Sequence, residues 1–248
     1  MAYQKASKKQ SKLQNPAALD ERVEVKKTMG RVLPILFNTD MVLAILDGRK
    51  TVTRRVVRYK YSNTEMKMRT DKYGTRLIEI QKDIEGETHG RNPDGGTWHK
   101  LLPYIEKKPP YKPGDILYVR ETWSEWTDGY VCKAWVQPFP QSGRYPDKFM
   151  KWHPSIHMPK EAARIWLRVT EVRVERLQDM TGQDILREGV NCHVHPEADY
   201  FDGNQKMMFA ELWDSTIKKT DSDRYGWDVN PWVWVIEFER CEKPVREE

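Results

Sequence analysis

A short basic segment carries the residue types best suited to chemistry in this chain. It spans residues 48–55 and reads GRKTVTRR, so four cations follow a glycine within seven residues. Alternation along a strand would place Lys50 and Arg54 on one face and Thr53 on the other. A lysine whose pKa is lowered by burial can accept a proton from a nearby threonine hydroxyl and make it a nucleophile. The same cations could hold a phosphate, or form a solvated basic strand end.

Two carboxylates could serve such a site. Glu188 falls in the last turn before a predicted glycine C-cap at Gly189, where a negative charge opposes the helix dipole at a cost of ~0.3 kcal/mol or more. Glu121 follows a predicted strand and adjoins Arg120. Either glutamate could orient a substrate. Glu188 could equally be solvated, and Glu121 could form an Arg–Glu pair at the strand end.

A loop over residues 152–159 reads WHPSIHMP and is rich in groups that contact bases. Trp152 can stack on a base, while Ser155 and His157 can hydrogen-bond its edge. Arg164 follows closely. We expect this loop to form one wall of a ligand cleft, although a proline-pinned loop packed by Trp152 is the structural alternative.

The elements that must position these residues alternate short strands with short helices. A strand over Val32–Phe37 precedes a helix over Met41–Leu46, which Thr39 or Asp40 could cap and Gly48 could end. A shift in apolar parity within Ile165–Val174 predicts a β-bulge. Further strands are expected over 51–57, 116–119, 130–136 and 232–238, and helices over 182–189 and 206–215. This order predicts an α+β fold with a mostly antiparallel, barrel-like sheet.

Composition and charge limit the classes of protein to consider. Of 248 residues, 27 are aromatic, which a disordered chain would not carry. The net charge of +5 lies entirely within residues 1–31, so the body is not a uniformly basic surface. We expect a flexible basic arm over 1–28 and a single domain over 29–243 with insertions at 59–110 and 137–155. The chain has no apolar run of ~18 residues and three cysteines, which favours the cytoplasm and no membrane.

Several blocks of the sequence resemble the ASCH domain, a small β-barrel of the PUA-like superfamily. Gly48, Lys50 and Arg54 match its G-x-K-x-x-x-R motif. Residues 112–121, which read KPGDILYVRE, resemble the turn and strand that follow in the family. The strand at 165–174, the helix ending at Gly189 and the closing strand at 232–238 also match its order. The longer form with two insertions resembles members found in bacteriophage genomes.

The resemblance implies a cleft that takes RNA or a nucleotide. Some members are amidohydrolases that deacylate N4-acetylcytidine with a Lys, a Thr and a Glu, which correspond here to Lys50, Thr53 and Glu188. Lys50 would be the base, Thr53 would attack the acyl carbon, and Glu188 would donate to the leaving amine. Other members resemble ribonucleases or bind RNA without known catalysis. The residues expected to contact the ligand are Arg49, Arg54, Arg55, Arg120, Glu121, Trp152, Ser155, His157 and Arg164.

We therefore expect a protein that binds RNA or a modified nucleoside, with hydrolysis as an open question. An enzyme is the first alternative, either an acylcytidine amidohydrolase or a ribonuclease. The second alternative is an interaction module that binds a protein partner such as a host factor or virion component. No cofactor or metal is expected, because Cys192, His193 and His195 lack a fourth ligand in a paired spacing.

Overall fold

The computed structural model describes residues 30–81, 89–91, 97–99, 104–127, 129–136, 150–190 and 201–244. These residues form an α+β fold with mostly strand content and few short helices, which confirms the predicted class. The predicted arm over 1–28 and residues 137–149 of the second predicted insertion lie outside the described residues.

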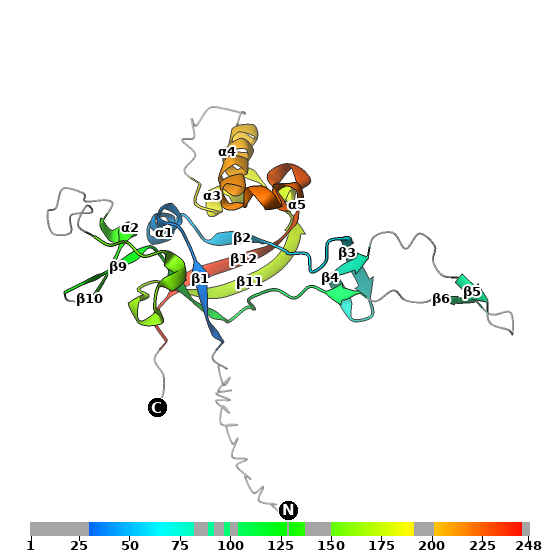
Figure 1. Cartoon of the computed structure of the whole chain (residues 1–248), viewed down its shortest axis with the longest axis horizontal. Helices are drawn as coiled ribbons and strands as arrows, with labels where there is room; N and C mark the ends of the chain where they lie inside the picture. The colour runs from blue at the N-terminus through cyan, green and yellow to red at the C-terminus, as the bar shows by residue number, and fades with distance from the viewer. Residues whose placement is uncertain are drawn as a thin grey trace, which may run out of the picture.

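A five-stranded sheet forms the centre of the molecule (Figure 1). In spatial order its strands are β1 (Val32–Leu36), β8 (Ile116–Arg120), β11 (Trp166–Arg176), β12 (Trp232–Cys241) and β2 (Val52–Val56). The pair β1 and β8 is parallel, and the other three pairs are antiparallel, as the prediction of a mostly antiparallel sheet required. Strands β1 and β2 are its two edges, and no closed barrel is detected in the described part of the chain.

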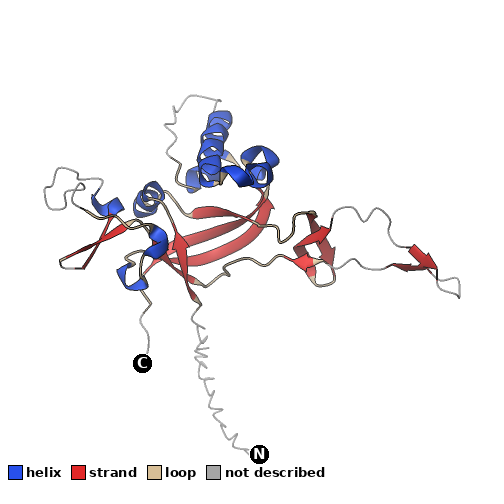
Figure 2. Cartoon of the chain, in the orientation of Figure 1, coloured by secondary structure: helices blue, strands red, loops and turns tan. Residues whose placement is uncertain are grey.

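Strand β12 is buried on both faces and organises the core. Trp234, Ile236 and Phe238 pack on one face with residues of α1 (Thr39–Leu46), as their alternation predicts. On the opposite face, Val233 and Val235 pack against α3 (Gly182–Arg187) and α4 (Phe201–Thr216). Figure 2 shows α3 and α4 together on that side of the sheet. The predicted bulge in β11 is present between Val169 and Glu171.

Helix α1 begins at Thr39, two residues before the predicted start at Met41. Asn38 is the N-cap, and its side-chain oxygen accepts a hydrogen bond from the backbone N–H of Met41 at 2.9 Å. The expectation that Thr39 or Asp40 caps this helix is therefore wrong, because both already belong to its first turn. Gly48 follows the C-cap with φ +77°, the left-handed conformation predicted for it.

The segment predicted as one strand over 130–136 divides into two elements. Strand β10 (Gly129–Cys132) pairs with β9 (Trp123–Trp126), and a helical turn, α2 (Lys133–Val136), follows at once. The strand ends there because the chain turns inward, so that Ala134 packs in the main core. Local propensity in an apolar run does not reveal such a turn.

The predicted insertion at 59–110 begins with a β-hairpin that packs on the main core. Strands β3 (Thr64–Asp71), β4 (Gly74–Gln81) and β7 (Ile105–Glu106) form a three-stranded sheet. Met66 and Leu77 are buried in the same cluster as Ile35 of β1. The β3–β4 hairpin therefore extends the existing core.

The remaining elements are short. They are β5 (His89–Arg91), β6 (Thr97–His99), α5 (Ser222–Tyr225) and the 3₁₀ turns η2 (Ser155–His157), η3 (Lys160–Ala162), η4 (Leu177–Asp179), η5 (Lys219–Asp221) and η6 (Trp227–Val229).

The buried carboxylate of Glu79 on β4 holds the start of the hairpin in place. It accepts hydrogen bonds from the backbone N–H groups of Lys60 and Tyr61 at 2.9 and 3.0 Å and from the Thr64 hydroxyl at 2.5 Å. Lys107 forms an ion pair with it. Burial opposes ionisation, but these hydrogen bonds outweigh it and lower the pKa of Glu79 to about 2.

Replacing Glu79 should therefore have a pH-dependent cost. A carboxyl whose folded pKa is depressed stabilises the fold above its unfolded pKa, and that stability is lost as pH falls towards the folded pKa. A shift from 4.5 to about 2 is worth ~3 kcal/mol at 1.36 kcal/mol per unit. In urea titrations, Glu79→Gln should be less stable than wild type at pH 7, and this difference should shrink between pH 4.5 and 2. A constant difference would contradict the assignment.

Candidate functional site

The basic segment runs from α1 into β2 beside the end of α3. The backbone N–H of Lys50 donates to Ala44 O at 3.0 Å, and that of Thr51 donates to Arg187 O at 2.9 Å. From the sheet, the N–H of Phe238 donates to Thr51 O at 3.0 Å. These bonds fix the segment where α1, α3 and β12 meet.

The side chain of Lys50 is completely buried, and three oxygen atoms surround its ammonium group. Nζ donates to Glu188 Oε2 at 2.7 Å, to Glu188 O at 2.8 Å and to Val52 O at 2.9 Å. Desolvation lowers the pKa of Lys50, although the charge of Glu188 and its hydrogen bond oppose this shift. Three acceptors match the three protons of an ammonium group, so this geometry satisfies the charged form.

The second oxygen of Glu188 faces a second buried cation, Arg54. Its Nη1 donates to Glu188 Oε1 at 3.3 Å. Its Nε and Nη2 both donate to Glu175 Oε1, at 3.0 and 2.7 Å, so β11 also holds the guanidinium. Glu188 is therefore shared by two buried cations from one short segment.

The end of α3 brings Glu188 to these cations. A capping box opens α3: Thr181 Oγ1 accepts from the N–H of Asp184 at 3.2 Å, and Asp184 Oδ2 accepts from the N–H of Thr181 at 3.0 Å. Glu188 is the C-cap, and Gly189 follows with φ +85°. A Cβ at position 189 would lie 2.7 Å from the Cβ of Ala44, so only glycine permits this approach of α3 to α1.

Thr53 and Arg55 lie on the other face of β2. Thr53 is buried opposite Ile236 of β12, which belongs to the main core. None of the hydrogen bonds described for Lys50 Nζ involves the hydroxyl of Thr53. Arg55 donates to Leu36 O at 2.7 Å and lies over the ring of Phe37, and burial lowers its pKa. Nucleophilic attack by Thr53 stays a prediction.

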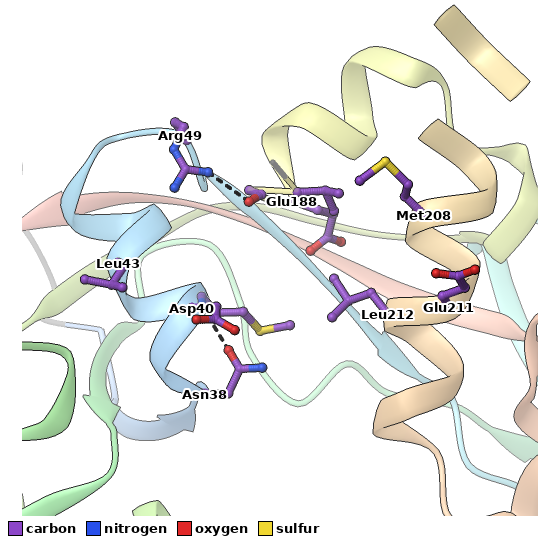
Figure 3. A pocket seen from close by; sticks show the side chains of 11 residues that line it. Asn38, Asp40, Leu43, Arg49, Glu188, Met208, Glu211 and Leu212 are labelled. Atoms are coloured by element: carbon purple, nitrogen blue, oxygen red, sulfur yellow. Dashed lines mark hydrogen bonds between the residues drawn. The ribbon is translucent and has the colours of Figure 1, made fainter. Parts of the chain in front are cut away.

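A cleft of about 650 Å³ opens above Glu188, between α1 and α4. Figure 3 shows the Glu188 carboxylate directed into the space between the two helices. Its lining residues are Asn38, Asp40, Met41, Leu43, Arg49, Glu188, Gly189, Val190, Met208, Glu211 and Leu212.

The charges in this cleft are mainly negative. Asp40, Glu188 and Glu211 contribute three carboxylates to the lining, of which Glu188 is paired with the buried cations Lys50 and Arg54. Arg49 is the single cation among the described lining residues. Arg49 is already engaged, because it donates to Gly189 O at 3.0 Å and to Asp47 Oδ2 at 3.1 Å. Such a cleft favours a neutral or cationic ligand with N–H donors and disfavours a phosphate group.

Eight of the nine predicted binding residues do not line this cleft, and Arg49 is the exception. Glu121 is buried and forms an ion pair with Arg164, whose Nε and Nη2 donate to its two oxygens at 2.9 and 3.1 Å. The Arg–Glu pair anticipated at this strand end thus exists, but with Arg164 and not with the adjacent Arg120. Arg120 instead donates to Met158 O at 2.7 Å.

The loop predicted as a wall of the cleft lies beside the β9–β10 hairpin. Trp152 packs with Val131 and Met150. Ser155 and His157 form the 3₁₀ turn η2, and His157 is exposed. None of Trp152, Ser155 and His157 lines the cleft, whose walls are α1 and α4. Their contact with a ligand stays a prediction.

Sequence reasoning missed the residues that make the walls. Met208 and Leu212 fall within the helix predicted over 206–215, but no pattern in the sequence indicated a role for Glu211 next to them. Asp40 and Met41 were read only as part of a helix start. The spacing of these residues along each helix could have indicated that they share a face. No local pattern indicated that α1 and α4 face each other.

Cys192, His193 and His195, which are not expected to bind a metal, lie outside the described residues. Where the chain is described, no group of three or more His, Cys, Asp or Glu side chains could hold a metal ion. None of the described helices has the length and apolar character needed to span a bilayer.

A scan against protein-family models, a search among curated proteins and a search among solved structures found no match to this chain. The resemblance to the ASCH domain therefore rests on the residues quoted for it above.

Removing Lys50 should destabilise the protein strongly. Lys50→Met leaves the buried carboxylate of Glu188 without its closest cation, and breaking a buried pair in this way costs ~3–5 kcal/mol. Lys67→Met is the matched control, because Lys67 pairs with Glu65 on the surface, where such a pair is worth ~0–1 kcal/mol. Equal losses in the free energy of unfolding for the two variants would contradict the role of Lys50.

Gln205 on α4 should be replaceable with a gain in stability. It lies one turn before Met208, is only 2% exposed, and neither its amide nitrogen nor its oxygen has a hydrogen-bond partner within the described structure. Each unpaired buried group costs ~1–3 kcal/mol, so Gln205→Met should raise the free energy of unfolding. Gln178→Met should lower it, because the Gln178 amide donates to Trp227 O at 2.8 Å. A loss of stability in Gln205→Met would show that the amide is paired.

Proposed function

We propose that this protein binds a nucleoside, free or within RNA, in the cleft between α1 and α4. The observation that carries the proposal is the buried carboxylate of Glu188 at the base of that cleft. The cleft volume of about 650 Å³ falls within the ~300–1,000 Å³ of ordinary small-ligand sites.

Glu188 retains acceptor capacity for a ligand. An ionised carboxylate offers about four acceptor positions. Lys50 uses one on Oε2, and Arg54 uses one on Oε1. The two cations also hold the group in one orientation, which reduces the entropy that a ligand must offset. The remaining positions suit an exocyclic amine, as when a glutamate accepts from N4 of cytosine.

The walls of the cleft suit a flat ring. Met41 and Met208 bring thioethers from opposite helices, and Leu43 and Leu212 add aliphatic surface. Methionine packs favourably against aromatic rings. The three lining carboxylates argue that the base, and not the phosphate, enters the cleft. A PUA-like fold of the ASCH type, in a cytoplasmic protein of bacteriophage type, is the family context that fits this proposal.

Hydrolysis is a second candidate, favoured by the lowered pKa of Lys50. In an acylcytidine amidohydrolase, the Thr53 oxygen would bond to the acyl carbon and its proton would pass to Lys50. The C–N bond would then break as the amine gains a proton, and water would release the acyl group. Before it can accept that proton, Lys50 must lose one of its own three protons and the hydrogen bond which that proton makes. Binding without turnover is therefore the function that this geometry favours.

Isothermal titration with cytidine and N4-acetylcytidine tests the binding proposal. Glu188→Gln keeps the shape of the side chain but removes its charge, and it should weaken binding about 10- to 150-fold, as for the loss of a hydrogen bond to a charged group. Glu239→Gln, on the exposed part of β12, is the control and should bind like wild type. Equal affinities of Glu188→Gln and wild type, or no binding of either nucleoside by wild type, would refute the proposal and favour a protein-interaction module.

Turnover is measured on the same preparations. Acetate release from N4-acetylcytidine and cleavage of a mixed-sequence RNA are compared between wild type and Lys50→Ala, with folding of the variant verified by circular dichroism. Turnover that disappears in a folded Lys50→Ala protein would establish an enzyme and its reaction class. Nucleoside binding without turnover would establish a binding protein.

A further inference from the structure

We propose that the β9–β10 hairpin and residues 150–153 form a second site, which binds single-stranded RNA by stacking on its bases. The inference rests on the proposed function for the class of ligand, but it concerns a separate surface. None of the residues of this surface lines the cleft between α1 and α4.

Three aromatic rings pack against one another in a fixed order along this surface. The rings of Trp123 and His153 are stacked with centroids 4.9 Å apart, and Tyr130 meets Trp123 edge-on at 5.5 Å. A backbone bridge holds the first two, with His153 N–H donating to Trp123 O at 2.7 Å and Trp123 N–H donating to His153 O at 3.2 Å. Tyr130 is 43% exposed, so this ordered stack is accessible from solvent at its outer end.

A cavity of about 320 Å³ adjoins the stack. It is lined by Ser124, Glu125, Trp126, Met150, Lys151 and His153. Its volume is at the low end for small-ligand sites and suits one ring system. Trp126 is 37% exposed and contributes an aromatic ring to the lining, and the exposed carboxylate of Glu125 can accept a hydrogen bond from a base edge.

Lysines lie beside these rings, which favours a polyanion as the partner. Lys151 lines the cavity, and Lys133 Nζ lies 5.8 Å from the centroid of the Trp152 ring. Aromatic faces alternating with cations are the arrangement by which proteins hold single strands, since the rings stack on bases and the cations neutralise phosphates. An acidic or apolar protein surface would use the lysines or the rings, but RNA uses both.

The position of this surface would allow one RNA molecule to reach both the hairpin and the cleft. Helix α2 continues directly from β10 and contacts α1, and α1 is one wall of the cleft. Figure 1 shows α1 between α2 and α4. An RNA with one base in the cleft can therefore cross α1 and contact the hairpin with its neighbouring nucleotides.

Fluorescence anisotropy with a labelled 12-nucleotide single-stranded RNA of cytidine and uridine tests the inference. Trp126→Ala should weaken binding about 5- to 150-fold, the range for loss of one stacked base. Lys151→Ala should reduce the slope of log K against log salt by about 0.7. Tyr73→Ala is the matched control, because Tyr73 is 75% exposed on the β3–β4 turn and also has cations over its ring.

Titration with free cytidine separates this inference from the proposed function. Trp126→Ala should bind cytidine like wild type, whereas Glu188→Gln should not. RNA affinity unchanged by both Trp126→Ala and Lys151→Ala would overturn the inference and leave the cleft proposal intact. Absence of RNA binding by wild type would also overturn the inference, and it would favour a protein as the partner of the exposed rings. The cleft proposal is tested separately, by the titration with cytidine.

Discussion

The buried carboxylate of Glu188, held between Lys50 and Arg54, is the interaction on which the rest of this site depends. All three side chains are removed from water, and a charge in that position is tolerated only when it is paired and hydrogen-bonded. Satisfying it requires the end of α3 to lie against the start of β2. Because α1 leads directly into that segment, the same contact sets the position of α1 and hence one wall of the cleft.

A chain of ion pairs extends this cluster across the sheet. Arg54 bonds to Glu175 at 2.7 Å, Arg173 lies 3.4 Å from Glu175, and Arg173 and Arg187 each lie 2.5 Å from Glu237. These residues come from β2, β11, β12 and α3, so the ion pairs connect the helix that ends at Glu188 to the strands beneath it. A ligand would thus meet a carboxylate whose orientation is set before binding, and this is the structural basis for proposing recognition over turnover.

Local signals in the sequence were sufficient for most elements and for the cations of the site. The capping box at Thr181, the glycine after α1 and the bulge in β11 each depend on a few neighbouring residues, and all three are present. Predictions failed where a neighbour in space decided the outcome. The run after Cys132 became helical because Ala134 turns into the core. The cap of α1 was missed for a local reason, because Asn38 precedes both residues considered and accepts a hydrogen bond from the N–H of Met41.

The sequence by itself determined an α+β chain, a mostly antiparallel sheet and the basic segment around Lys50, because alternation, capping and charge spacing are local properties. Tertiary structure alone decided that Arg164, and not Arg120, pairs with Glu121, and that α4 forms the cleft wall expected from the loop at Trp152. It also decided that the face of β2 that carries Thr53 lies against the main core. These outcomes depend on which surfaces bury apolar area against one another, and that choice is made by contacts between residues far apart in the chain.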